Sequence, residues 1–213
     1  SYLSNSIHEP ELLYAGSDDG LIHVRRNKDT EWQNISPLME GESLVNAIEV
    51  SPHDASKVYA VLTRYKFGDH RPFVFVSKDY GATWENIGAN ISGSDFVRVV
   101  REDPLIEGLL YAGTERGLFI SLNDGEDWVP YQSNLPVCPV TDLIIKDNDL
   151  IAATSGRGFW ILDDIASIQQ SAQGLDSMAF RIFNPKANYK FVLGGQGRGD
   201  VGKNPPAGVL IDY

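Results

Sequence analysis

Two arginines lie in matching short loops of this chain, and their side chains are the ones most able to bind a ligand. Arg116 and Arg157 each precede a glycine and stand between two predicted strands. Two guanidinium groups on one face can bind a carboxylate or an acidic sugar through paired hydrogen bonds. The alternative is that each arginine pairs with a nearby acid, such as Glu115 or Asp163, and only stabilises its own turn.

A long basic and aromatic loop is the second candidate ligand-binding segment. It runs from 60 to 77, is much longer than the corresponding stretch 112–121, and carries Arg64, Lys66 and Arg71 beside aromatic side chains. Such groups on a long loop can hold an anionic or sugar ligand. A contact with a neighbouring repeat or domain, or a mobile hairpin tip, explains the extension equally well.

No residue pattern marks a catalytic, metal or nucleotide site. The adjacent acids at 18–19 and 163–164 are typical of solvated turns, and the four histidines show no metal-ligand spacing. The glycine-rich stretch 194–199 leads into no predicted helix, and the single Cys138 excludes an internal disulfide or a cysteine-based zinc site. We therefore expect no cofactor and no metal, and the catalytic residues stay unassigned.

The composition of the chain argues against nucleic-acid binding and against a membrane span. A net charge of −11 over 213 residues repels a phosphate backbone, so we expect no nucleic-acid binding. No apolar run approaches the ~18 residues of a membrane span. The chain has 20 glycines and is 10% aromatic, which indicates a globular protein rich in strands and turns.

The elements that position these residues form an internal repeat. A short apolar strand recurs at 13–17, 58–62, 110–114 and 151–155, and each copy is followed by another apolar strand. Four short strands per unit, at a spacing of roughly 41 to 52 residues, predict the blades of a β-propeller. The fold class we expect is all-β, with four-stranded antiparallel blades whose innermost strand is the apolar one that opens each blade. The expected blades are 2–36, 43–90, 94–136 and 138–165.

A turn motif, S-x-[DN]-x-G-x-x-W, supports this reading. Its fullest copy has Ser77, Asp79, Gly81, Thr83 and Trp84, a second has Ser121, Asn123, Gly125 and Trp128, and a degraded first copy keeps Asn27 and Trp32. The Asx side chain accepts backbone N–H groups, the glycine supplies a positive φ, and the indole packs between blades. We therefore expect the Asx at 79 to form a turn rather than act as an acid, and all three tryptophans to be largely buried.

The motif resembles the Asp-box, or BNR repeat, of propellers such as sialidases, xyloglucanases and sortilin-type receptors. The stretches 110–121 and 153–164 are similar to bacterial BNR-repeat proteins commonly described as glycosyl hydrolases or sortilin-like proteins. The resemblance implies that the remaining blades of a longer propeller and a C-terminal β-sandwich belong to the parent chain, and it implies an extracytoplasmic, periplasmic or secreted, location. The first copy departs from the motif by losing its glycine and threonine, and the fourth blade has no copy.

Beyond the blades the sequence changes character, which divides the chain at 1–165 and 166–213. A helical turn or two is expected over 165–173, followed by strands at 178–183 and 189–193. A glycine- and proline-rich linker over 194–207 then leads to a last apolar strand.

The function we expect is non-catalytic: a binding or scaffold module that presents a ligand face to a protein, peptide or glycan. In a propeller that face is made by the loops between the second and third strands and by the inter-blade loops, opposite the motif turns. The alternative is a glycoside hydrolase, sialidase-like or xyloglucanase-like, with catalytic residues partly outside this sequence. Two carboxylates in one cleft about 5–10 Å apart, one with a raised pKa, would favour the enzyme. A structural spacer fits the sequence as well.

Overall fold

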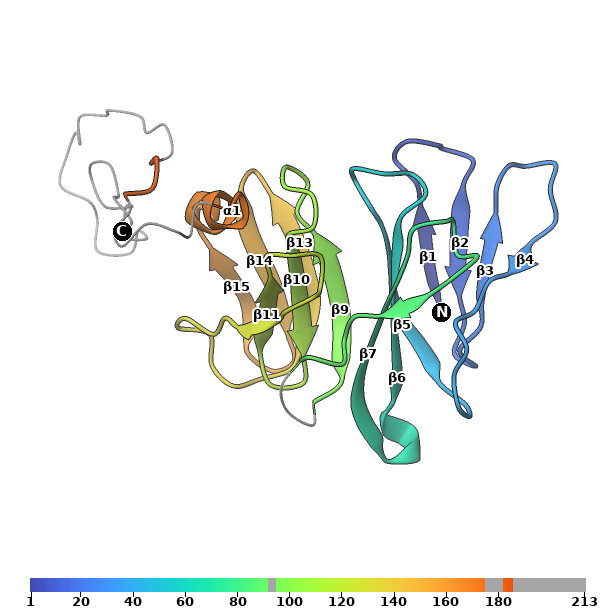
Figure 1. The fold of residues 1–213 in the computed structure, drawn as a ribbon. Coiled ribbons are helices and arrows are strands. Elements are labelled where there is room, and N and C mark those ends of the chain that lie inside the picture. The colour runs from blue at the N-terminus through green and yellow to red at the C-terminus, as the bar shows by residue number, and fades with distance from the viewer. Residues whose placement is uncertain (92–94, 175–181, 186–213) are drawn as a thin grey trace, which may run out of the picture.

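The computed structural model describes residues 1–91, 95–174 and 182–185. Within them the chain forms four antiparallel sheets that follow one another in chain order across the molecule (Figure 1). The all-β propeller fold expected from the repeat is confirmed. The strands and linker expected from 186 onward, and most of the strand expected at 178–183, lie outside the described residues.

Each sheet is a meander in which sequential strands pair. Three sheets have four strands: β1 (Tyr2–Asn5), β2 (Leu13–Gly16), β3 (Ile22–Arg25) and β4 (Gln33–Asn34); β5 (Leu44–Val50), β6 (Val58–Arg64), β7 (Asp69–Ser77) and β8 (Glu85–Asn86); β9 (Val97–Glu102), β10 (Leu110–Thr114), β11 (Leu118–Ser121) and β12 (Val129–Pro130). The fourth described sheet has three: β13 (Val140–Lys146), β14 (Asp149–Thr154) and β15 (Gly158–Leu162). We call these sheets blades 1 to 4. The opening strands β1, β5, β9 and β13 contact one another in sequence, so they line the inner side of the arc.

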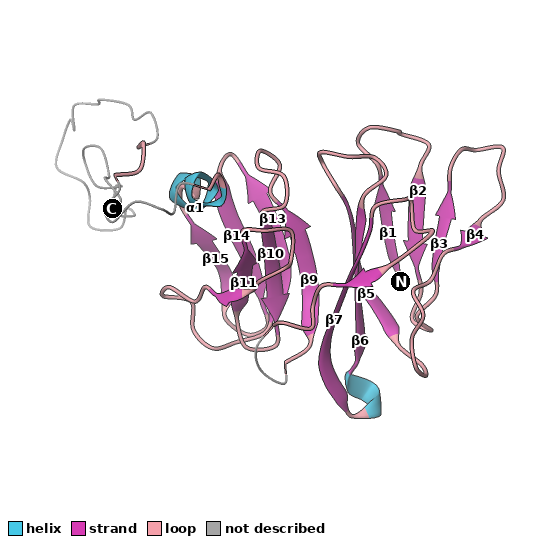
Figure 2. Ribbon diagram, viewed as in Figure 1, coloured by secondary structure: helices cyan, strands magenta, loops and turns pink. Residues whose placement is uncertain are grey.

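Two short helices complete the described part (Figure 2). Helix α1 (Ala166–Ala172) follows blade 4 as expected, and it buries Ile168 against the core that blades 2, 3 and 4 share. The 3₁₀ turn η1 (Tyr65–Phe67) forms the tip of the β6–β7 hairpin and ends at Gly68 in the left-handed region.

A tyrosine at the same place in three blades anchors the core. Tyr14, Tyr59 and Tyr111 are fully buried on the second strand of blades 1, 2 and 3. Burying an aromatic side chain of this size stabilises the fold by about 2 kcal/mol. Each tyrosine lies opposite one residue of the opening strand of its own blade, so the first two strands pair in the same register in all three blades.

The segments 77–84 and 121–128 form tight turns between the third and fourth strands, and we call them the Trp turns. In the first, Ser77 Oγ accepts the Gly81 N–H at 2.7 Å, and Asp79 accepts the Thr83 N–H at 2.8 Å and its hydroxyl at 2.7 Å. These bonds lower the pKa of Asp79 to about 2, with the Thr83 hydroxyl as the largest cause. The Asx at 79 is therefore a turn-forming residue, as the motif predicted.

Each Trp turn reaches back to the preceding blade. The Trp84 indole donates to the Ile35 carbonyl at 2.5 Å, and the Trp128 indole donates to the Ile87 carbonyl at 2.8 Å. Both carbonyls come directly after the fourth strand of the blade before. Trp128 is 6% exposed and Trp84 is partly buried, so the expected packing between blades is present in both turns.

The degraded first copy behaves differently, and the expectation that Trp32 is largely buried is wrong. Its side chain is 41% exposed, beneath the guanidinium of Arg25. Asn27 still accepts the Asp29 N–H at 3.0 Å, so part of the turn survives. The physical reason lies in the turn: this copy lacks the motif's glycine and threonine, and it is closed instead by the Thr30 hydroxyl, which donates to the Asn27 carbonyl at 2.9 Å.

Candidate functional site

The meander places the turns between second and third strands at one end of the blades and the Trp turns at the opposite end. The turns between second and third strands share one end with the inter-blade loops, because every strand pair is antiparallel. The Trp turns and the loops between first and second strands share the other end. Arg116 and Arg157 occupy equivalent turns at the first end, in blades 3 and 4.

Neither arginine pairs with the acid first considered for it. The Arg116 side chain is 68% exposed, and its Nε lies 3.6 Å from Asp95 of the inter-blade loop. Glu115 instead binds Arg98 at 2.6 Å. Arg157 is exposed, and within the described ranges no ion pair is recorded for its side chain. Both guanidiniums face solvent at one end of the molecule.

The long loop is mostly a hairpin with a fixed tip. Arg64 and Arg71 both bind Asp69, at 3.1 Å and 2.8 Å, and the hydrogen bond from Arg71 is the main reason that the pKa of this acid falls to about 2. Lys66 lies in the 3₁₀ turn. Tyr65 stacks on Phe96, the residue before β9, with ring centroids 4.9 Å apart. The extension therefore makes a contact between blades 2 and 3.

At the other end, a cavity of 320 Å³ is lined by the opening strands of all four blades, and we call it the axial cavity. Ser4, Glu49, Arg101 and Ile144 line it from equivalent positions, since they pair with Tyr14, Tyr59, Tyr111 and Ile151 of the second strands. Its apolar lining comes from three blades and includes Ile7, Val50, Ile144 and Ile145.

Arg101 joins the blades around this cavity. Its guanidinium contacts Glu49 of blade 2 at 3.3 Å, Asp142 of blade 4 at 2.7 Å and the hydroxyl of Tyr2 of blade 1 at 3.1 Å. Its Nε also donates to the Leu143 carbonyl at 2.9 Å. One side chain from blade 3 therefore links the inner strands of the other three blades.

Glu49 carries an unusual proton affinity. Burial raises the pKa of its carboxyl to about 7; the charge of Arg101 opposes this, while the charges of Glu102 and Asp142 add to it. The side chain is still 22% exposed. Glu49 therefore changes charge near neutral pH, where an unperturbed glutamate stays ionised.

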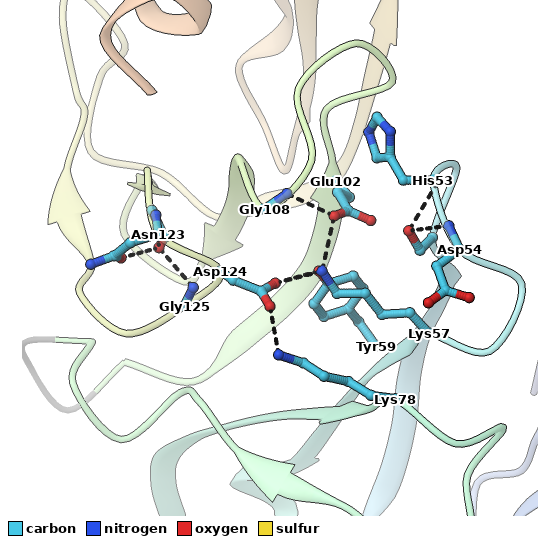
Figure 3. A network of polar contacts seen from close by, with 12 residues as sticks. His53, Asp54, Lys57, Tyr59, Lys78, Glu102, Gly108, Asn123, Asp124 and Gly125 are labelled. Atoms are coloured by element: carbon cyan, nitrogen blue, oxygen red, sulfur yellow. Dashed lines mark hydrogen bonds and ion pairs between the residues drawn. The ribbon is translucent and has the colours of Figure 1, made fainter. Parts of the chain in front are cut away.

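A buried polar network lies beside the cavity, between blades 2 and 3 (Figure 3). Lys57 Nζ binds Glu102 at 3.2 Å and Asp124 at 2.8 Å, while Tyr59 and Lys78 also bind Asp124 at 2.7 Å and 3.0 Å. Burial alone would lower the pKa of Lys57, but its bonds to the two acids raise it. Lys57 thus stays charged in the seam between the blades.

Sequence reasoning missed both the axial cavity and this network. The signal was present: Glu49 and Arg101 each stand three residues before the proline that follows their strand, so two opposite charges occupy one repeat position. Likewise Lys57 stands where blades 1 and 3 have Leu12 and Leu109. A charged residue at a repeat position that is apolar in other blades indicates a role specific to its own blade. Comparing the charges at equivalent positions of the repeats would therefore have identified these residues.

Known structures with a similar fold are β-propeller proteins. A GH74 xyloglucanase from Xanthomonas campestris matches with a TM-score of 0.60 and 14% identity, over 76% of this chain and 29% of that chain. YCF48 bound to D1 peptide matches with a TM-score of 0.57 and 14% identity, over 76% of this chain and 50% of that chain. The extracellular domain of BT4673 from B. thetaiotaomicron matches with a TM-score of 0.54 and 15% identity, over 72% of this chain and 20% of that chain. These likenesses show the fold.

No protein-family model matches the sequence, and no curated protein matches it either. The chain spans half or less of the length of each of the three solved chains. Neither helix in the described part of the chain is long and apolar enough to cross a membrane.

Proposed function

We propose that this chain is part of a non-catalytic β-propeller binding module of the Asp-box type, which takes a protein or peptide ligand at its axial cavity. The observation that carries the proposal is the cavity itself, because polar residues of blades 1, 2 and 3 and apolar residues of blades 1, 2 and 4 surround one space of 320 Å³. A concave, largely apolar site with a few convergent polar groups is the usual form of a ligand pocket.

The charges of the cavity favour binding over catalysis. Glu49 and Asp142 both bind the guanidinium of Arg101, so each carboxylate already has a fixed partner. An acid and a nucleophile held on one cation are poorly placed to act on opposite sides of a glycosidic bond. The likeness to a propeller that binds a peptide supports the same class of function.

The arginine end offers a second contact surface in this proposal. Arg64, Lys66, Arg71, Arg116 and Arg157 are placed at one end of the blades, where Arg116 and Arg157 remain open to solvent. They would hold acidic groups of a bound partner. An extracytoplasmic location is part of the proposal, supported by the likeness to extracellular domains.

One observation favours a glycoside hydrolase as the second candidate. Glu49 has a pKa of about 7, and Asp142 pairs with the same guanidinium, that of Arg101. A carboxyl that is protonated near neutral pH can serve as a general acid beside an ionised partner. The likeness to a xyloglucanase points to xyloglucan as the substrate to test.

Calorimetric titration with a xyloglucan heptasaccharide and with ten-residue lysine-rich and glutamate-rich peptides tests the two candidates. Asp142→Asn removes a 63% exposed charge that pairs with Arg101 of the cavity lining, and Asp147→Asn, which removes an 80% exposed charge outside the cavity, is the control. Peptide binding that weakens only in Asp142→Asn supports the module. Release of reducing sugar from xyloglucan that disappears in Glu49→Gln supports the enzyme. Binding of no probe overturns both.

A further inference from the structure

Blade 4 ends at a strand edge that no described strand pairs with. β15 is its outermost strand, whereas blades 1, 2 and 3 each add a fourth strand (Figure 1). Those fourth strands are two residues long, and they consist of polar residues or contain a proline: Gln33–Asn34, Glu85–Asn86 and Val129–Pro130. β15 has five residues, Gly158–Leu162, with neither a charge nor a proline. A long apolar edge of this kind readily pairs with another strand, because charges, prolines and short length are what normally protect an edge.

The side chains on both faces of β15 are apolar. Trp160 and Leu162 point toward blade 3 and pack on the core that blades 2, 3 and 4 share. Phe159 and Ile161 lie on the other face, where they are 80% and 58% exposed. A strand added to β15 would therefore bury apolar surface on both faces, in addition to forming main-chain hydrogen bonds.

An open groove lies beside this edge, between β15 and the segment 131–135 that follows β12. We call it the outer groove. Its space of 40 Å³ exceeds the ~15 Å³ that a single water molecule requires, and it is open to solvent. The groove can therefore take the edge of one aromatic ring while the rest of a ligand lies along β15. Its lining is mostly apolar and includes Leu118, Tyr131, Leu135, Trp160 and Leu162.

The seam between blades 2 and 3 shows which side chain fits such a place. There Trp128 directly precedes β12, and its indole reaches blade 2 and donates to the Ile87 carbonyl at 2.8 Å. Ile87 is the first residue after β8, and Tyr131 is the first residue after β12, so the two occupy equivalent positions. Trp84 makes the same contact between blades 1 and 2. An indole is therefore the group that this repeat places in the counterpart of the outer groove.

The described part of the chain does not fill the outer groove itself. Residues 182–185 are held at α1, where the Asn184 N–H donates to Gln170 Oε1 at 2.9 Å. After Trp160 the sequence has no further tryptophan, so the rest of it cannot repeat what Trp84 and Trp128 do. A fourth strand with an indole is therefore expected from another molecule.

We propose that the edge of β15 binds an extended peptide segment of another protein, which adds a fourth strand to blade 4 and places a tryptophan in the outer groove. The residue after the tryptophan lies opposite Ile161 and is apolar, as Val129 lies opposite Ile120 in blade 3. Main-chain pairing provides the affinity, and the groove provides the selectivity for the aromatic residue. The outer groove shares no lining residue with the axial cavity, so this site does not depend on the function proposed there.

The probe is an acetylated and amidated hexapeptide, Glu-Asp-Trp-Val-Pro-Tyr, which copies residues 126–131. The control peptide has alanine in place of the tryptophan. We expect NMR titration of the labelled full chain to shift the amides of β15, and the outward-facing amides of this strand to exchange more slowly with the peptide bound. The alanine peptide should bind about tenfold more weakly, because the tryptophan is the buried anchor of the contact.

Variants of the groove test the position of the indole. Leu162→Glu should abolish the binding, because it puts a charge where the indole should lie. Asn134→Glu changes an exposed residue of the same lining, and it is the second variant if Leu162→Glu does not fold. It should weaken the binding as well. Gln33→Glu, which changes an exposed amide on β4 of blade 1, is the matched control and should leave the binding unchanged.

Four outcomes would overturn the inference. The first is no binding of the hexapeptide, or equal binding of the two peptides. The second is binding that Leu162→Glu and Asn134→Glu leave unchanged. The third is protection of every amide of β15 before peptide is added, since another segment of this chain then occupies the edge. The fourth is a shift of these amides that grows with protein concentration alone, since a second copy then occupies it.

Discussion

Replacing Gly125 by alanine tests how tightly a Trp turn is packed on the preceding blade. Gly125 has φ +87°, and an added Cβ would lie 2.6 Å from Ile87 Cδ1 and 2.9 Å from Ile87 Cβ. Gly156 has nearly the same backbone, with φ +85°, but nothing lies within 4 Å of its added Cβ. The two glycines therefore share the conformational cost of a side chain and differ only in the space around it.

The expected magnitudes follow from these two terms. Adopting a left-handed conformation costs a non-glycine residue about 1–2 kcal/mol, and this alone applies to Gly156→Ala. Forcing Ile87 aside adds about 1–3 kcal/mol of overpacking. Its carbonyl accepts the Trp128 indole, so weakening that bond adds about 0.5–1.5 kcal/mol. Gly125→Ala should therefore cost about 2–4 kcal/mol more than Gly156→Ala.

Urea unfolding followed by tryptophan fluorescence measures both free energies, with the linear extrapolation applied where the transitions are two-state. The control for the turn itself is Gly81→Ala, whose added Cβ would meet Ile35 in the equivalent place. It should cost about as much as Gly125→Ala. Equal losses at Gly125 and Gly156 would refute the idea that each Trp turn is fitted against the blade before it.

Three further outcomes are expected. Trp128→Ala should cost about 3–5 kcal/mol in urea unfolding, and Trp32→Ala, which removes a 41% exposed side chain, about 1 kcal/mol or less; similar costs would contradict the unequal packing of the two indoles. Asp79→Asn should leave stability near that of the parent at pH 7, as Asn123 already fills the matching place, whereas Asp79→Ala should lower it measurably; the reverse order would argue against a turn-forming role. Glu49 has a folded pKa raised from 4.5 to about 7, so the folded state binds the extra proton and stability should fall as pH rises from about 4.5 to 7; Glu49→Gln should flatten that part of the pH–stability curve, and an unchanged slope would assign it to another group.

The sequence was sufficient for the architecture because blades repeat. A repeated strand pattern fixes the order of pairing without any long-range information, and the tyrosines at 14, 59 and 111 fall on one register as the alignment of the repeats requires. The turn motif also predicted local hydrogen bonds correctly, since Asp79 and Asn123 bond within four residues of themselves. Such contacts can be predicted because both partners lie close together in the sequence.

The axial cavity could not be found in the same way. Arg101 contacts partners from three other blades, and although Glu49 and Asp142 stand one repeat away from it, the repeat spacing does not say that these side chains meet. Motif reading also directed attention to loops, where Arg64 and Arg71 turned out to share Asp69. Convergence of side chains from separate blades depends on how the blades are inclined to one another, and no local pattern encodes that angle.

The direction of the Trp turns has a consequence for how the protein is made. Both indoles reach backward, Trp84 to blade 1 and Trp128 to blade 2, so the outer seam of a blade is completed by residues translated after it. The two tryptophans are 44 residues apart, which corresponds to about 2–9 s of synthesis at ordinary rates. During that interval a nascent blade carries an open groove beside its fourth strand. Folding on the ribosome should therefore proceed one blade behind synthesis, and a pause in translation before residue 128 would prolong the exposure of blade 2 while blade 1 is already closed.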